Sequence, residues 1–102
     1  MKKTVLNEVF DYLKQIAVVN SESEFSKDWL GRSECYMRTL RFKQTQPSIG
    51  TLAICASKLH HYGNRLKDKQ KHSDISEQML NLSNACHSQI GTLSKMHWMN
   101  ER

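Results

Sequence analysis

The sequence predicts an all-α fold: one compact domain of five helices that ends in a long C-terminal helix. Apolar residues recur at spacings of three and four along most of the chain, which is the period of an amphipathic helix. Serines, a glycine and the single proline interrupt this pattern where helices are expected to begin or end. No strand pattern, internal repeat or low-complexity tract accompanies it, and 102 residues suffice for one hydrophobic core but not for two.

The first two helices are predicted on either side of a polar break at Asn20. The first covers residues 4–18, and its apolar stripe is Val5, Leu6, Val9, Phe10, Leu13, Ile16 and Ala17. The second begins at Ser21, which forms a capping-box pattern with Glu24. It ends at Gly31, because glycine readily adopts the left-handed conformation of a helix C-terminus. Its buried side is marked by Phe25, Trp29 and Leu30.

The third helix is predicted over residues 33–42, with Ser33 as its N-cap. Three residues at helical spacing form its inner side, and they are Tyr36, Met37 and Leu40.

A fourth helix is predicted to open at Pro47 and Ser48, a typical helix start. Its apolar face consists of Ile49, Leu52, Ala53, Ala56 and Leu59. The helix either ends at Gly63 or continues through it, because Leu66 keeps the helical period.

A last helix of about 25 residues is predicted to begin at Ser73 or Asp74. Its continuous apolar stripe is Ile75, Met79, Leu82, Cys86, Ile90, Leu93 and Met96. Two arrangements would cover this stripe. The last helix either packs against the fourth as an antiparallel hairpin, or it joins a second copy of the chain in a homodimer through residues 74–99.

The middle of the chain carries a characteristic spacing pattern. It comprises a turn glycine, a serine two residues later, apolar residues six and nine after the glycine, and a proline–serine pair: Gly31, Ser33, Met37, Leu40, Pro47 and Ser48. Over about residues 21–59 this pattern resembles the lambda-repressor-like (Xre-type) helix-turn-helix family. We therefore expect a helix-turn-helix domain over residues 1–72, followed over residues 73–102 by the C-terminal helix, which serves packing or dimerisation. Four positions depart from the family: Phe25-Ser26 replaces a leucine–alanine pair, Arg32 a small apolar residue, and Lys43 a glycine.

The function implied by the resemblance is a DNA-binding transcriptional regulator with helix 33–42 as its recognition helix. The residues expected to contact double-stranded DNA are Ser33, Glu34, Tyr36, Arg38, Thr39, Arg41, Lys43, Gln46 and Ser48. Two acidic residues are expected near this surface. Glu22 occupies the position of a glutamine that often approaches DNA in that family, and Glu34 either accepts a hydrogen bond from cytosine or opposes the phosphates.

The charge distribution bears on the same question. The net charge is +5, but residues 32–72 alone carry nine cations and two acids, a net charge of +7. Such a local excess attracts a polyanion, or it forms a solvated basic face.

A second class of function is a protein-binding module or inhibitor that contacts an acidic or nucleic-acid-binding protein. Trp29 is either core or the anchor of that contact. We expect no enzyme, cofactor or metal site, since no nucleophile–base pair, carboxylate pair or glycine-rich phosphate loop is visible. The three cysteines lack C-x-x-C spacing, and His60 and His61 point in different directions on a helix. Without an apolar signal core or membrane span, the chain is expected to be cytoplasmic.

Overall fold

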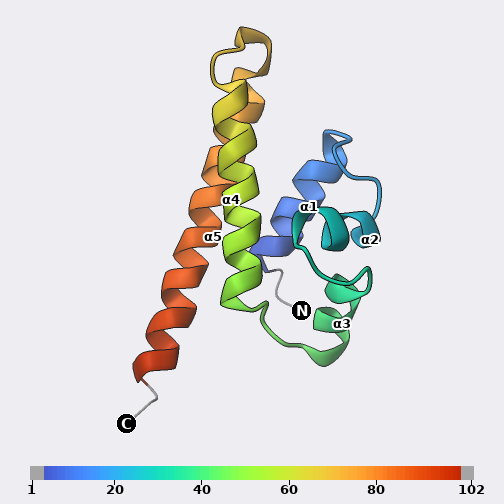
Figure 1. Cartoon of the computed structure of the whole chain (residues 1–102), viewed down its shortest axis with the longest axis vertical. Coiled ribbons are helices and arrows are strands. Elements are labelled where there is room, and N and C mark those ends of the chain that lie inside the picture. The colour runs from blue at the N-terminus through green and yellow to red at the C-terminus, as the bar shows by residue number, and fades with distance from the viewer. Residues whose placement is uncertain (1–3, 100–102) are drawn as a thin grey trace.

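The computed structural model describes residues 4–99 and contains no strand within that range. Its elements are α1 (Val5–Gln15), α2 (Glu22–Glu24), the π-helical η1 (Phe25–Trp29), α3 (Tyr36–Lys43), α4 (Ile49–Leu66), the 3₁₀-helical η2 (Gln70–His72) and α5 (Ser73–Met99). Figure 1 shows α4 and α5 as a long hairpin, with α1, α2 and α3 gathered on one side of it. The predicted all-α class, with five helices and a long C-terminal helix, is confirmed.

Two buried serine hydroxyls set the register of the α4–α5 hairpin. Ser76 Oγ donates to the carbonyl of Gly63 at 2.6 Å, and Ser83 Oγ donates to the carbonyl of Ala56 at 2.8 Å. Both bonds fit one antiparallel register, in which Ile49 at the start of α4 lies level with Ile90. Of the two arrangements expected for the apolar stripe of the last helix, the antiparallel hairpin is therefore present, along the whole length of α4.

Gly63 permits close packing inside α4 and does not end the helix. A Cβ atom at this position would lie 2.8 Å from Leu80 Cδ2 and 3.3 Å from the Ser76 carbonyl oxygen. The absence of a side chain lets α5 approach closely enough for the Ser76 hydrogen bond. Of the two predicted ends of the fourth helix, the structure has the later one, at Leu66.

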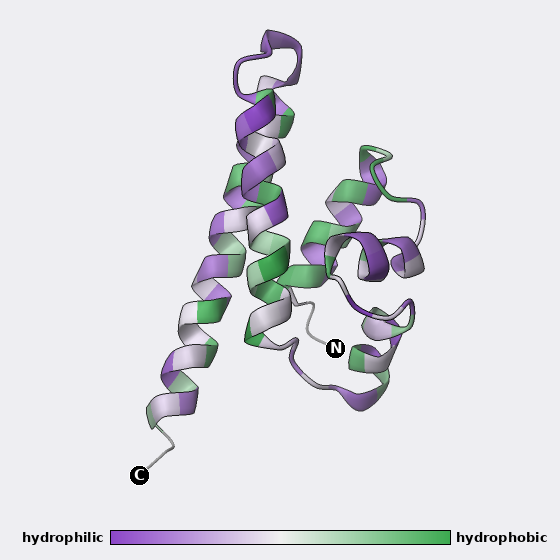
Figure 2. Cartoon of the chain, in the orientation of Figure 1, coloured by the Kyte–Doolittle hydropathy of each residue, from purple (hydrophilic) through white to green (hydrophobic). Residues whose placement is uncertain are grey.

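The core lies where α1 and η1 meet the hairpin. Phe10 of α1 and Phe25 of η1 pack with their ring centroids 5.5 Å apart. The largest fully buried side chains include Leu6, Leu13, Phe25, Leu30, Leu52 and Leu59. Two residues assigned to the apolar face of the fourth helix differ from the prediction, because Ala53 is exposed and Ile49 is 38% exposed. In Figure 2 the loop joining α4 to α5 is hydrophilic, in agreement with its position far from this core.

A Schellman motif ends α1 at Gln15, earlier than the predicted residue 18. The amide of Val18 donates to the Leu13 carbonyl at 2.8 Å, and the amide of Ala17 donates to the Lys14 carbonyl at 3.1 Å. Ala17 has a φ of 64°, the left-handed region in which an alanine Cβ is strained. The helix stops here because these bonds satisfy its last carbonyls and turn the fully buried Val19 toward the core.

Replacing Ala17 with glycine is expected to stabilise the protein. Glycine adopts the left-handed conformation without strain, so Ala17→Gly should raise the free energy of unfolding by about 0.5–1 kcal/mol. Urea denaturation followed by circular dichroism measures this change. The matched control is Ala53→Gly, at an exposed site inside α4, which should lower the free energy of unfolding by about 0.5–1 kcal/mol. A loss of stability in both variants would contradict the left-handed assignment of Ala17.

Candidate nucleic-acid interface

The turn between η1 and α3 contains a glycine in the left-handed conformation, as predicted from the sequence. Ser21 Oγ accepts the amide of Glu24 at 3.2 Å and so caps the start of α2, as expected. Gly31 has a φ of +65°. The amide of Arg32 donates to the carbonyl of Ser26 at 3.0 Å, and this bond, which spans six residues, closes a turn directly after the π-helical η1. The π-helical turn itself left no signal in the sequence.

The third helix begins later than predicted. It spans Tyr36–Lys43, whereas the sequence analysis assigned residues 33–42 and named Ser33 as the N-cap. Ser33 contributes its backbone carbonyl, which accepts the Tyr36 amide at 3.1 Å. The N-cap position is held by Cys35, whose side chain makes no capping bond. Ser33 and Glu34 therefore lie in the turn before α3, where both are exposed.

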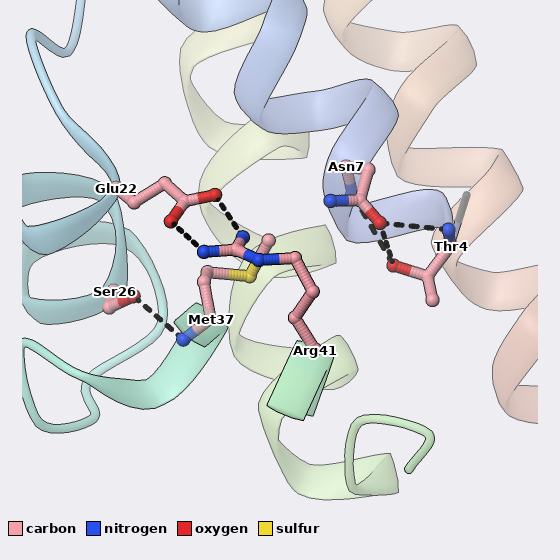
Figure 3. Close-up of polar contacts among 6 residues, drawn as sticks. All are labelled: Thr4, Asn7, Glu22, Ser26, Met37 and Arg41. Atoms are coloured by element: carbon pink, nitrogen blue, oxygen red, sulfur yellow. Dashed lines mark hydrogen bonds and ion pairs between the residues drawn. The ribbon is translucent and has the colours of Figure 1, made fainter. Parts of the chain in front are cut away.

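The missing cap of α3 is supplied by a residue of the preceding helix. Ser26 is fully buried, and its Oγ accepts the backbone N–H of Met37 at 3.3 Å (Figure 3). Met37 is the second residue of α3, so its amide has no acceptor within the helix. Ser26 thus takes the role that Ser33 was expected to have. Ser26 occupies the position of the alanine in the lambda-repressor-like pattern. Its small side chain permits η1 and α3 to approach closely.

A second set of contacts joins α3 and the turn to the start of α4. Arg32 Nε donates to Thr51 Oγ1 at 2.8 Å, and Arg32 Nη2 donates to Ser48 Oγ at 3.1 Å. The guanidinium of Arg32 lies 5.6 Å from the centroid of the Tyr36 ring. The amide of Ser48, which was expected to face phosphate, donates to Tyr36 Oη at 3.3 Å. Ser48 Oγ also accepts the Thr51 amide and caps α4 as predicted.

Arg41 and Glu22 form a two-pronged ion pair (Figure 3). The Arg41 nitrogens donate to the two carboxylate oxygens of Glu22 at 2.6 and 3.0 Å. The hydrogen bond and the negative charge of Glu22 raise the pKa of the Arg41 guanidinium. Both residues were noted in the sequence, Arg41 as a DNA contact and Glu22 as an acid near the same surface, but their pairing was not predicted. The pair joins α2 to α3 at the surface, and the Glu22 carboxylate neutralises the charge of Arg41.

The outward face of α3 consists of four exposed side chains. Met37 is buried and Leu40 is half-buried, so the opposite side of the helix points to solvent. That side carries Arg38, Thr39, Phe42 and Lys43. Arg38 Nη2 contacts Cys35 Sγ at 2.9 Å, and Gln46 is exposed in the loop that follows.

Phe42 is the residue of this face that the sequence analysis missed. Its side chain is 86% exposed, the highest value among the exposed large hydrophobic residues of the described chain. Its exposure could have been predicted from helical spacing. A residue five positions after Met37 and two after Leu40 projects away from the buried side of the helix. The left-handed Gln44, with a φ of 53°, ends α3 directly after this face.

The basic segment 32–72 divides into two separate groups. Arg32, Arg38, Arg41 and Lys43 surround α3 and the turn before it. The remaining cations are in α4 and the loop that follows, and they are Lys58, Arg65, Lys67, Lys69 and Lys71. Since α4 has 18 residues and rises by 1.5 Å per residue, its ends are about 27 Å apart. The charge excess therefore does not form one face.

Trp29 belongs to the core, and the proposed role of an exposed protein-contact anchor is wrong. It is only 6% exposed, and its ring lies 5.6 Å from that of Tyr62. The cysteines Cys55 and Cys86 are also buried in the hairpin, while Cys35 is exposed. A hydrogen bond with Cys86, together with burial, raises the pKa of the Cys55 thiol.

Among residues 4–99, no group of three or more histidine, cysteine or acidic side chains is placed to hold a metal ion. Within the same range, no helix combines the length and the apolar character needed to cross a membrane.

The fold and this surface together define a small helical domain whose short α3 is held at its start by other helices and is free on its outer side. The chain belongs to a family of unknown function, DUF6626, whose model matches residues 6–99. Neither the curated proteins nor the solved structures gave a match.

The cap from Ser26 predicts the outcome of two serine substitutions. Ser26→Ala leaves the buried Met37 amide without an acceptor and should lower the free energy of unfolding by about 1–2 kcal/mol. The matched control, Ser33→Ala, removes the hydroxyl that the sequence suggested as the cap and should change it by less than about 0.5 kcal/mol. Urea denaturation of both variants gives the comparison. An equal loss in the two variants would mean that Ser33 caps α3 in solution.

Proposed function

We propose that the protein is a DNA-binding transcriptional regulator that inserts α3 into the major groove. The observation that carries this proposal is the outward face of α3, where Arg38, Thr39, Phe42 and Lys43 are all exposed. The inner side of the same helix packs through Met37, and the Ser26 hydroxyl caps its start. A short helix held in this manner and free on one side is the arrangement that a recognition helix requires. The spacing from Gly31 to Ser48, which resembles the lambda-repressor-like family, supports the same proposal.

The chemistry of the four side chains suits a groove contact. Arg38 can donate two parallel hydrogen bonds to the O6 and N7 atoms of guanine. Phe42 can pack against the methyl group of thymine, which also explains why a large apolar side chain is exposed between two cations. Lys43 and Gln46, at the end of α3 and beyond it, are suited to phosphate oxygens. Tyr36 and Ser48 act mainly by fixing α3 to α4.

The Arg41–Glu22 pair gives this proposal a sharp test. Glu22→Gln removes the carboxylate and frees Arg41 for phosphate, so affinity for a duplex at low salt should rise about fivefold. The plot of log affinity against log salt should become steeper by about one unit, because one more phosphate is neutralised. Lys43→Ala should make it shallower by about one unit. Fluorescence anisotropy of a labelled duplex measures both effects.

The control for this experiment is Glu24→Gln, which changes the same charge on the same short helix but leaves the Arg41 pair intact. It should alter the affinity by less than twofold. Equal gains from the two variants would show that Arg41 does not contact the phosphates. A wild-type chain and a Glu22→Gln variant that both fail to bind any duplex at low salt would overturn the proposal itself.

A dimer is the second part of the proposal, and the far end of α5 supports it. In the hairpin register, residues 91–99 lie beyond the start of α4 and extend about 13 Å further (Figure 1). This end carries exposed apolar side chains: Met96 is 56% exposed, Trp98 62% and Met99 47%. We propose that a second copy covers them, since a symmetric dimer would present two α3 helices to successive turns of one DNA face.

Sedimentation of the full chain tests the dimer. The wild type should sediment as a dimer, and a Met96→Glu/Trp98→Glu variant should sediment as a monomer, because two charges then enter the apolar contact. The control variant, Gln78→Glu/Asn81→Glu, adds the same two charges at exposed positions on the part of α5 that lies beside α4. It should remain dimeric with an unchanged circular dichroism spectrum. A monomeric wild type would remove the dimer and leave the proposal for α3 in place.

One observation favours a second function, a protein-binding module for an acidic or nucleic-acid-binding partner. Exposed aromatic residues beside cations are common anchors of protein contacts, and Phe42 has this setting. Selection of bound duplexes from a random pool separates the two functions. A defined motif supports the DNA-binding regulator. An empty pool supports the protein-binding module when a captured partner is lost on Phe42→Ala substitution.

A further inference from the structure

A hollow of about 500 Å³ lies between the α4–α5 hairpin, η1 and the loop that follows α1. Its volume falls within the range of about 300–1,000 Å³ that is usual for small-molecule sites. The apolar part of its wall consists of Val18, Trp29, Tyr62, Leu66 and Met79. These residues come from four different segments of the chain, so the hollow exists only in the folded protein.

Two aromatic rings form one side of the hollow. Trp29 and Tyr62 pack with their ring centroids 5.6 Å apart and their planes inclined by 44°. Trp29 is held in the core at 6% exposure, whereas Tyr62 is 41% exposed and reaches the mouth. A rigid aromatic wall of this kind offers a flat apolar surface for a planar or aliphatic group.

Three cations complete the lining, and no acidic residue of the described chain shares it. They are Lys58, Arg65 and Lys69. Within residues 4–99, none of the three forms an ion pair, and the hydrogen bond of Lys58 goes to the backbone carbonyl of Asp28 and not to a carboxylate. Lys58 Nζ also lies 5.3 Å from the centroid of the Trp29 ring, which holds this charge against the aromatic wall.

Two of these cations, Arg65 and Lys69, lie at or beyond the end of α4 that is remote from the Ser48 contacts with α3. Arg65 is 16 residues after Ile49 along α4, a distance of about 24 Å. They are therefore not part of the outward face of α3. A cluster of cations without a carboxylate partner, beside an apolar hollow, matches a ligand that has an anionic group and an apolar body.

We propose that this pocket binds a small organic anion with an aromatic or aliphatic body. The carboxylate or phosphate group of the ligand lies among Lys58, Arg65 and Lys69, and its body lies against Trp29 and Tyr62. The proposal concerns a surface separate from α3 and does not depend on DNA binding.

Nuclear magnetic resonance of the ¹⁵N-labelled full chain tests the proposal, with 1-naphthoate as the probe. The two tryptophans give two indole N–H signals, which a Trp98→Phe variant assigns. The signal of Trp29 should shift and saturate on titration, while the signal of Trp98, exposed at the far end of α5, stays in place. Naphthalenemethanol, which has the same ring without the charge, should bind at least about fivefold more weakly. Inorganic phosphate, which has the charge without the ring, should bind more weakly as well.

Charge variants connect the binding to the pocket. Arg65→Gln/Lys69→Gln should weaken 1-naphthoate binding about fivefold or more and leave naphthalenemethanol binding unchanged. The control, Lys67→Gln/Lys71→Gln, removes the same charge from neighbouring positions outside the pocket and should change neither. The proposal is overturned if the Trp29 signal does not move, if both tryptophan signals move together, or if the alcohol or phosphate binds as tightly as naphthoate. An equal loss of affinity in the two charge variants would overturn it as well.

Discussion

The close approach of α4 and α5 supports the rest of the domain. It depends on Gly63, where any side chain would collide with Leu80, and on two serine hydroxyls that satisfy carbonyl groups inside the interface. These bonds are buried, so each replaces a lost interaction with water and also selects one register. With the register set, α4 and α5 present a continuous apolar surface to α1 and η1. The same register places residues 91–99 beyond α4, which creates the exposed end of α5.

The short α3 depends on this support, because eight residues are too few to form a stable helix alone. Its start is capped from η1 by Ser26, and its surface is joined to α2 by the Arg41–Glu22 pair. Tyr36 and Arg32 connect it to the first turn of α4. Nearly all of these contacts lie on the inner side or at the ends of the helix, which leaves the side with Phe42 free.

The division of charge is the reason that we propose two separate roles for one basic segment. The cations beside α3 are exposed and lie next to an aromatic residue and an ion pair. Those near the end of α4 line a hollow with an aromatic wall. A long chain of phosphates suits the first setting, and a small ligand with an apolar body suits the second. Since α4 separates the two groups, binding at one need not exclude binding at the other.

Local signals in the sequence determined the helical class and most helix ends of this protein. The period of the apolar residues, the caps at Ser21 and Ser48, and the left-handed Gly31 all act between residues close in the chain. Five of the predicted contact residues, Arg38, Thr39, Arg41, Lys43 and Gln46, were also found exposed on α3 or just after it, because helical spacing alone separates an inner from an outer side.

Only the tertiary structure decided the features that join distant segments. Ser26 caps α3 from another helix, Gly63 serves packing and not termination, and Glu22 pairs with Arg41. The burial of Trp29 and the pocket beside it likewise require η1, α4 and α5 to be brought together. Each of these depends on which side chains meet in space, and spacing along a single chain does not contain that information.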